Sequence, residues 1–152
     1  MQVIKGNKQQ IDNCLSIARE LPQYFMEQGI AAMSRDLHDH RLYIAEDSDQ
    51  VLGFAAVQSK SNQVAEISWM AVKPAYQHRG VGTLLINRIV DDLQTEGVRL
   101  LEVKTLAPTV DYFPYALTRR FYEGRGFIHL ETIDPYPAWE PGNPCAIYVK
   151  VV

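Results

Sequence analysis

The chain has 152 residues, 47% of them hydrophobic and 22% charged, and its formal net charge is -3. The composition is that of one globular domain, residues 1–152, and it excludes a predominantly disordered chain. No run approaches the roughly 18 apolar residues that cross a bilayer, and the small acidic excess argues against a nucleic-acid-binding protein, which normally carries a basic surface.

The first half of the chain predicts one strand, two helices and three further strands. Asn7 and Gln10 form a capping-box pattern, and apolar residues follow at helical spacing as far as Leu21. Pro22 separates this helix from the next one. Short polar turns join the three later strands, which is typical of antiparallel hairpins. The predicted elements are a strand at 2–5, helices at 11–21 and 23–39, and strands at 41–46, 51–58 and 64–72.

The second half alternates helices and strands, and it begins where the apolar period becomes helical at Gly80. A strand, a helix and a strand in succession predict a parallel crossover between residues 64–72 and 100–106. The whole order is β-α-α-β-β-β-α-β-α-β-β, a mixed α/β sheet. The predicted elements are a helix from Gly80 to a stop at Gly97, a strand at 100–106, a loop at 108–115, a helix at 117–123, a strand at 127–132, a Pro-rich loop at 133–144 and a strand at 146–152.

A glycine-containing turn lies between the strand at 64–72 and the helix that follows it. The run Gln77-x-x-Gly80-x-Gly82 places two glycines where the helix begins, and free backbone N–H groups favour an anion there. Arg79 adds a positive charge that suits a diphosphate. The turn lacks the Gly-Lys-Ser/Thr of a Walker loop, and Leu85 stands where a dinucleotide fingerprint needs a third glycine. Two interpretations remain: an anion site, or a tight turn whose glycine serves packing.

Two motifs together resemble a known family. Gln77-His78-Arg79-Gly80-Val81-Gly82, after a strand that ends Met70-Ala71-Val72-Lys73-Pro74, is similar to the acyl-CoA-binding motif of the GNAT superfamily of N-acetyltransferases. Downstream, Arg120-Phe121-Tyr122-Glu123-x-x-Gly126-Phe127 resembles the helix and strand that carry the second motif of that superfamily. The resemblance implies a GNAT-like fold with a splayed central sheet and transfer of an acetyl group from acetyl-CoA, without a metal, to a primary amine of a small molecule or protein.

The resemblance also implies how acetyl-CoA is held. Backbone amides of the turn would bind the pyrophosphate, and the main chain at the end of the strand would pair with the pantetheine arm like an extra strand. The residues assigned to acetyl-CoA are Met70, Ala71, Val72, Gln77, His78, Arg79, Gly80, Val81, Gly82 and Thr83. Homodimers are common in the superfamily, so a homodimer is also expected.

Two residues are candidates for acid–base chemistry. Tyr122 stands where the family usually has its general-acid tyrosine, and the alternative is a tyrosine that only packs on the helix face. Glu66 is a charged residue in a strand whose other residues are mostly apolar or small. It stands where histone-type members have a glutamate that acts as the base. The alternative for Glu66 is a structural carboxylate bonded to a neighbouring strand.

The other candidates are less specific. Asp111, with Tyr112 or Tyr115, forms either an acceptor wall or packing over the sheet edge, and Tyr136, Trp139 and Glu140 in the Pro-rich loop leave the same two interpretations. The spacing of His38 and His40 does not place both rings on one helical face, so no metal site is expected.

Two cysteines, Cys14 and Cys145, occur in a sequence whose first residues lack the apolar core of a signal peptide. This predicts free thiols, a buried Cys14 and a cytoplasmic protein.

Two alternatives to the enzyme stay open: a non-catalytic acyl-CoA-binding or regulatory module of the same fold, and a nucleotide-binding protein that uses the glycine turn for ATP or NAD.

Overall fold

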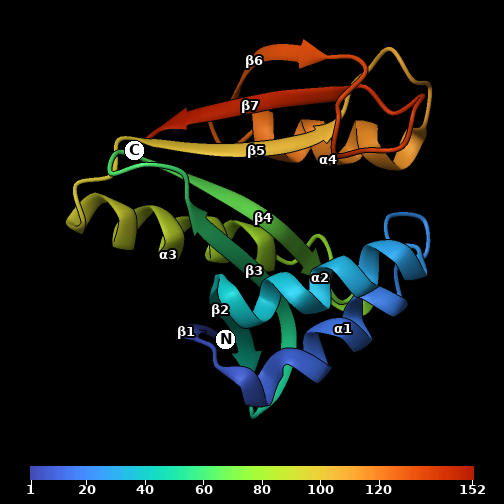
Figure 1. Ribbon diagram of the computed structural model, residues 1–152. Helices are drawn as coiled ribbons and strands as arrows, with labels where there is room; N and C mark the ends of the chain where they lie inside the picture. The colour runs from blue at the N-terminus through green and yellow to red at the C-terminus, as the bar shows by residue number, and fades with distance from the viewer.

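A computed structural model, which describes residues 1–152, contains one mixed sheet of seven strands and four helices (Figure 1). The strands are β1 (Gln2–Lys5), β2 (Arg41–Asp47), β3 (Gln50–Ser59), β4 (Val64–Val72), β5 (Leu100–Leu106), β6 (Ile128–Ile133) and β7 (Cys145–Val151). The helices are α1 (Ile11–Arg19), α2 (Glu27–Asp39), α3 (Val81–Thr95) and α4 (Phe113–Glu123). The strand order is β1-β2-β3-β4-β5-β7-β6, and only β4 and β5 run parallel. The predicted mixed α/β fold is confirmed.

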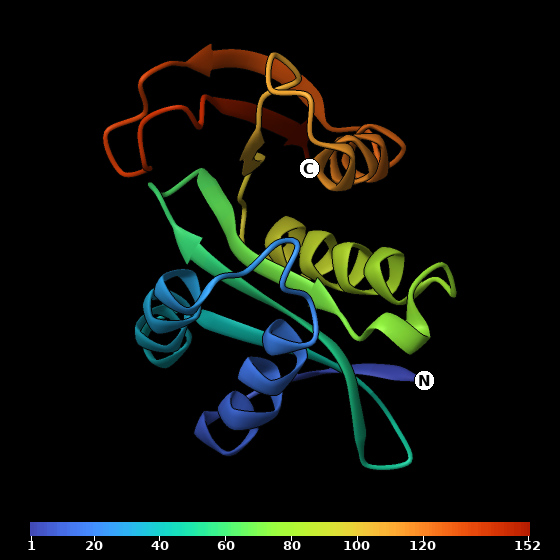
Figure 2. The same cartoon turned by 90° about the vertical axis from the view of Figure 1, so that its right-hand side faces the viewer.

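The helices lie on both faces of the sheet, and each face has its own hydrophobic core (Figures 1 and 2). One core joins α1 and α2 to β2, β3 and β4, and Cys14 and Met33 are fully buried in it. The larger core joins α3 to the other face, and it continues to Tyr122 of α4 and to the strands beyond β5. The sheet therefore separates two hydrophobic cores.

The centre of the sheet opens because β4 and β5 stop pairing halfway along their length. The parallel ladder ends where Ile67 lies opposite Val103, although both strands continue to Val72 and Leu106. A β-bulge in β4 stands at the same place, since Val57 of β3 pairs with Ile67 and the next partner pair is Ala56 with Trp69. A bulge bends its strand and increases its twist, so it accounts for the divergence. The predicted splayed sheet is confirmed.

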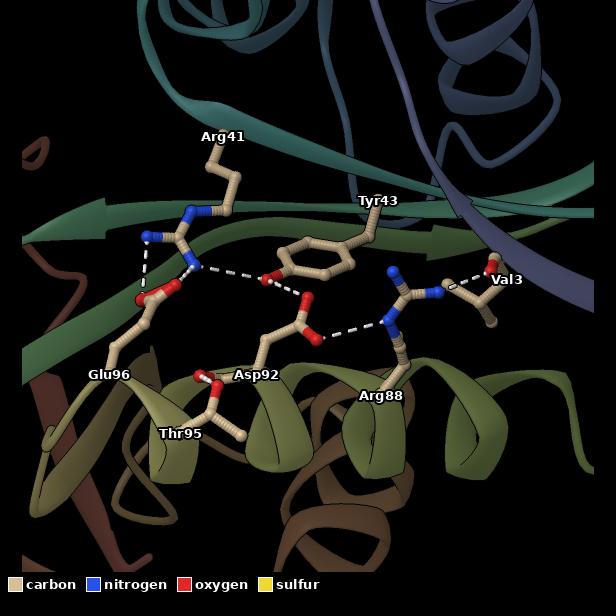
Figure 3. Close-up of polar contacts among 7 residues, drawn as sticks. All are labelled: Val3, Arg41, Tyr43, Arg88, Asp92, Thr95 and Glu96. Carbon is tan, nitrogen blue, oxygen red and sulfur yellow. Dashed lines mark hydrogen bonds and ion pairs between the residues drawn. The ribbon is translucent and has the colours of Figure 1, made fainter.

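Helix α3 is fixed on the sheet by a network of charged and phenolic groups (Figure 3). Arg41 donates two hydrogen bonds to Glu96, at 2.7 and 2.9 Å. The buried Tyr43 hydroxyl donates to Asp92 (3.1 Å), and Arg88 donates to the same carboxylate and to a carbonyl of β1. Burial raises the pKa of Tyr43, so its hydroxyl stays a donor. The network holds the axis of α3 and hence the position of its N-terminus beside β4.

The predicted elements agree with the structure except near two helix starts. The capping box of Asn7 and Gln10 is present, and Gly97 follows α3 with a positive φ of 79°. Helix α2 begins at Glu27, not at residue 23. Helix α4 begins at Phe113, so the end of the predicted loop at 108–115 is helical. Pro114 misled the prediction, because proline is well tolerated in the first turn of a helix, where its missing N–H costs nothing.

Both cysteines are buried free thiols, as predicted for Cys14. Burial raises the pKa of Cys14 to about 12 and that of Cys145 to about 11, so both stay protonated near neutral pH.

None of the helices has both the length and the apolar character that crossing a membrane requires.

Candidate active site

The candidate site lies where β4 and β5 diverge. From Trp69 to Val72, β4 pairs with β3 on one edge, and its other edge has no strand beside it. Because alternate main-chain groups of a strand point to opposite edges, this free edge presents N–H and C=O groups to an extended ligand. The structure thus places Met70, Ala71 and Val72 on the open side of the sheet.

The glycine turn forms the start of α3 beside this edge. His78 and Gly80 have positive φ angles of 62° and 85°, and Val81 is the first helical residue. None of the backbone N–H groups from His78 to Thr83 donates to another backbone group. A cluster of free N–H groups at the positive end of a helix dipole is the usual protein site for a phosphate or diphosphate.

The side chains of the turn make different contacts. Gln77 donates its amide N–H to the Val72 carbonyl (3.1 Å), so it fastens the turn to the end of β4 and does not point outward. His78 and Arg79 are exposed, and the Arg79 guanidinium lies 5.6 Å from the centre of the Tyr76 ring. All three residues therefore lie in the turn beside β4, and the side chain of Gln77 stabilises the turn itself.

Gly82 allows α4 to approach the first turn of α3. A Cβ atom at Gly82 would lie 2.8 and 2.9 Å from two ring carbons of Phe121 and 3.2 Å from the end of the Met70 side chain. The Phe121 ring is itself held, because the Arg125 guanidinium stacks on it at 4.3 Å and donates to Thr83 Oγ1 (2.9 Å). The close approach of α3 and α4 thus depends on the missing side chain.

Replacing Gly82 with alanine is expected to lower the free energy of unfolding by about 1–3 kcal/mol, because the Phe121 ring must move against Arg125. Gly29→Ala is the matched control. It lies in α2 with nothing within 4 Å of the added methyl group, so it should stabilise the protein by about 0.5–1 kcal/mol. Urea unfolding of both variants measures the difference, and equal stabilities would contradict the packing role of Gly82.

Arg125 lies beside the glycine turn, although no sequence pattern singled it out. Its guanidinium bonds Thr83 and the Phe121 carbonyl, so it adds a permanent positive charge beside the free amides of α3. The only signal in the sequence was its position directly before Gly126 in the second motif. That signal did not show the bond, since Arg125 and Thr83 are distant in the chain.

Tyr122 points from α4 toward the open edge of β4. The residue is 6% exposed, and its hydroxyl has a single partner, Met70 Sδ at 3.7 Å. The ring packs edge-on against Phe121 and Phe127, at 5.2 Å in both cases. Burial raises the pKa of Tyr122, so its hydroxyl remains a proton donor throughout the physiological range. The tyrosine is packed, as its alternative interpretation expected, and its hydroxyl also contacts Met70 of the strand that borders the opening.

Glu66 lies on the other face of β4 in a cluster of charges. The residue is 5% exposed, and its carboxylate accepts hydrogen bonds from Lys104 Nζ and Gln58 Nε2, both at 2.6 Å. Lys104 also lies 3.5 Å from Glu102 and 5.8 Å from the Tyr136 ring. Burial lowers the pKa of Lys104, but the bond to Glu66 and the two carboxylates outweigh this and raise it. Glu66 thus forms an ion pair with a lysine that stays protonated, and this ion pair joins β4 to β5.

Two further polar contacts join α2 to the bulge of β4. His40 Nδ1 lies 2.7 Å from Ser68 Oγ, and Trp69 donates its indole N–H to Asp36 (2.8 Å). His38 instead bonds the Ser34 carbonyl, so the two histidines have separate partners. No group of three or more His, Cys, Asp or Glu side chains is arranged to hold a metal ion.

The aromatic segment before α4 packs against the connection between α1 and α2. Tyr112 donates its hydroxyl to the Gln23 carbonyl, and Tyr24 donates to the Pro114 carbonyl, both at 2.7 Å. Tyr115 meets the Tyr24 ring edge-on at 5.2 Å. These contacts link the segment before α4 to the connection between α1 and α2.

The remaining candidates from the loops, Asp111, Tyr136, Trp139 and Glu140, do not all lie in one place. Asp111 is exposed, while Tyr136 packs on Trp139 (5.3 Å) and lies over Lys104. Glu140 is exposed, and its side chain makes no hydrogen bond. The structure therefore brings Tyr136 to the Glu66 cluster and leaves Asp111 and Glu140 outside it.

The comparisons with known proteins agree with this geometry. The sequence model of the acetyltransferase (GNAT) domain family matches residues 38–129, and no curated protein matches the chain. A crystal structure described as a GNAT-family acetyltransferase from Desulfovibrio desulfuricans superposes with a TM-score of 0.85 and 22% identity over 98% of this chain and 97% of that one.

Two other solved structures are similar in fold. The ribosomal-protein-S18-alanine N-acetyltransferase from Escherichia coli has a TM-score of 0.78 and 18% identity over 99% of this chain and 93% of that one. A GNAT-family acetyltransferase from Elizabethkingia anophelis with acetyl-CoA bound has a TM-score of 0.76 and 15% identity over 99% and 97% of the two chains.

Proposed function

The chain belongs to the GNAT acetyltransferase family, and we propose that it transfers an acetyl group from acetyl-CoA to a primary amine of a small molecule or protein. The observation that carries the proposal is the row of free amides from His78 to Thr83, next to an unpaired edge of β4 toward which the Tyr122 hydroxyl points. Structural neighbours include an aminoglycoside 6'-N-acetyltransferase with coenzyme A and the S18-alanine enzyme, so amines of both kinds are acceptors on this fold.

Acetyl-CoA would be held mainly by main-chain groups. The amides from Arg79 to Thr83 suit the pyrophosphate, and Arg79 and Arg125 supply positive charge on either side of them. The free edge of Met70, Ala71 and Val72 suits the pantetheine arm. A ligand that follows this path has its pyrophosphate at α3 and its sulfur near Tyr122.

The reaction needs a proton acceptor and a proton donor. An ammonium group is not a nucleophile, so the acceptor amine loses a proton before its nitrogen attacks the thioester carbonyl. A backbone N–H of β4 would stabilise the oxyanion of the tetrahedral intermediate. When the carbon–sulfur bond breaks, Tyr122 would give its phenolic proton to the departing thiolate. The proton taken from the amine balances the proton that Tyr122 gives.

Glu66 is the proposed proton acceptor, acting through a water molecule. Glu66→Gln is expected to reduce kcat about 10-fold or more, and most at low pH, where deprotonation of the amine is limiting. The matched control is Gln58→Ala, which removes the uncharged hydrogen-bond partner of Glu66 and leaves its carboxylate in place. Gln58→Glu is not suitable, because it would place a second negative charge beside Glu66. If Glu66→Gln keeps the pH profile of the wild type and only lowers the melting temperature, Glu66 has the structural role instead.

The first experiment is thermal melting with acetyl-CoA, ATP or NAD. A ligand at 100 times its dissociation constant adds about 2.7 kcal/mol, which for a domain of this size raises the melting temperature by about 5–10 °C. We expect this increase with acetyl-CoA alone. A larger increase with ATP or NAD would favour the nucleotide-binding alternative.

The second experiment measures coenzyme A release with a panel of amines that includes an aminoglycoside, a polyamine and a peptide with N-terminal alanine. The proposal expects at least one amine to exceed the rate of acetyl-CoA hydrolysis. Tight binding of acetyl-CoA without such an amine would favour the non-catalytic module.

We further propose that the protein acts in the cytoplasm as a homodimer. The outer strand β6 exposes 67% of Ile128 and 61% of Leu130, and Val151 at the end of β7 is 77% exposed. Apolar side chains on an unpaired edge strand favour association with a second copy. Sedimentation of the wild type against Leu130→Glu tests the dimer, and a monomeric wild type would contradict it.

A further inference from the structure

Thr105 is distinguished by a buried hydroxyl without a partner. The residue is 3% exposed, and its Oγ1 makes no hydrogen bond. No other buried side-chain nitrogen or oxygen atom of the protein lacks one. Because an unpaired buried hydroxyl is unfavourable, its presence calls for a functional explanation.

Thr105 lies on β5 beside the opening, on the face toward α3 and α4. Alternate residues of a strand share a face, and Val103 belongs to the core under α3. Thr105 follows Val103 by two residues, and its cross-strand neighbour Ala146 lies in the same core. Since Val103 is the last residue of β5 that pairs with β4, Thr105 is the first residue of this face to flank the opening.

The corresponding position on β4 is Met70. Ile67 lies opposite Val103, and because of the bulge the next residue of β4 packed against this core is Met70. The hydroxyl of Tyr122 reaches Met70 from α4. Groups from β5, β4 and α4 therefore border the same part of the opening, the part where the proposed function puts the sulfur of acetyl-CoA.

We infer that the Thr105 hydroxyl hydrogen-bonds the sulfur-proximal part of the pantetheine arm of acetyl-CoA, an inference that rests on the proposed function. This part of the arm contains an amide and the thioester carbonyl. The main chain of β4 can pair with only one edge of an extended arm, so polar groups on its other edge need partners from β5. A hydroxyl both donates and accepts, so Thr105 suits either group.

The test compares Thr105→Val, which replaces the hydroxyl by a methyl group, with Thr105→Ser, which keeps it. In the ligand-free protein, Thr105→Val should melt at or above the wild-type temperature, because it removes an unsatisfied buried group. Its dissociation constant for acetyl-CoA should rise about threefold to tenfold, the loss of one hydrogen bond. Thr105→Ser should bind acetyl-CoA like the wild type.

Two controls locate the effect. Adenosine 3',5'-bisphosphate has no pantetheine arm, so the wild type and Thr105→Val should bind it equally. Thr132→Val on the exposed strand β6 should leave acetyl-CoA affinity unchanged. Thr105→Ala replaces the valine variant if valine prevents folding.

The outcomes separate this inference from the proposed function. If the wild type binds acetyl-CoA and Thr105→Val binds it equally well, the inference is wrong and the proposed function stands. A wild type that does not bind acetyl-CoA overturns both. Reduced affinity of Thr105→Val for the bisphosphate as well would show a general distortion of the site and also overturn the inference.

Discussion

Tyr122→Phe is expected to lower kcat about 100-fold and to leave the dissociation constant of acetyl-CoA unchanged, if the phenol protonates the departing thiolate. The substitution removes one oxygen atom from a ring that stays packed between Phe121 and Phe127. That oxygen has Met70 Sδ as its single hydrogen-bond partner, so the ligand-free protein should change little in stability. Stopped assays for kcat and calorimetry for affinity measure the two effects separately.

Tyr43→Phe is the matched control for a buried tyrosine. Its hydroxyl belongs to the network between β2 and α3, so this variant should lower the melting temperature and keep kcat. Because burial raises the pKa of Tyr122, ionisation of its phenol should not reduce the wild-type kcat as the pH approaches about 10, the ordinary value of tyrosine. Wild-type turnover by Tyr122→Phe would assign the proton to another donor and leave Tyr122 a packing role.

Lys104→Met is expected to destabilise the protein by about 2–3 kcal/mol at neutral pH, because it removes the nearer of the two lysines beside the buried Glu66 carboxylate and leaves only Lys60, whose Nζ lies 3.9 Å away. Gln58 would be the only remaining short hydrogen bond to that carboxylate. Urea unfolding at neutral pH measures the loss of stability.

The double variant Glu66→Gln/Lys104→Met tests the origin of this destabilisation. With both charges absent, most of the stability should return, and the difference from the sum of the single variants gives the coupling of the pair. A destabilisation below about 1 kcal/mol in Lys104→Met would mean that Lys60 or water compensates the charge of Glu66, so that the pair with Lys104 behaves like a surface ion pair.

The fold and the position of the glycine turn could be predicted because their signals are local. The strand at 64–72, the turn with Gly80 and Gly82 and the second motif at 120–127 are each one short continuous segment. Their context, a strand before the turn and a helix after it, is also local. The start of α4 was predicted too late because Asp111, Pro114 and three aromatic residues have the composition of a loop.

The electrostatic setting of the site was not predictable, because its partners are distant in sequence. Lys104 and Glu66 meet only through the parallel pairing of β4 with β5, and Arg125 meets Thr83 only through the packing of α4 on α3. The sequence left the role of Glu66 open, and no pattern of residues indicated its ion pair. A threonine in a strand is ordinary, so nothing in the sequence marked Thr105.

The bulge at Ser68 also has a consequence for how the protein can evolve. One additional residue turns neighbouring parts of β4 toward different faces: Met70 and Val72 pack on the side of α3, while Ser68 and Trp69 contact α2. Main-chain groups at a strand edge are insensitive to which side chains the strand carries. Substitutions on the α2 side can therefore change that face of the molecule while the edge of β4 that we propose for acetyl-CoA keeps its pattern of main-chain groups.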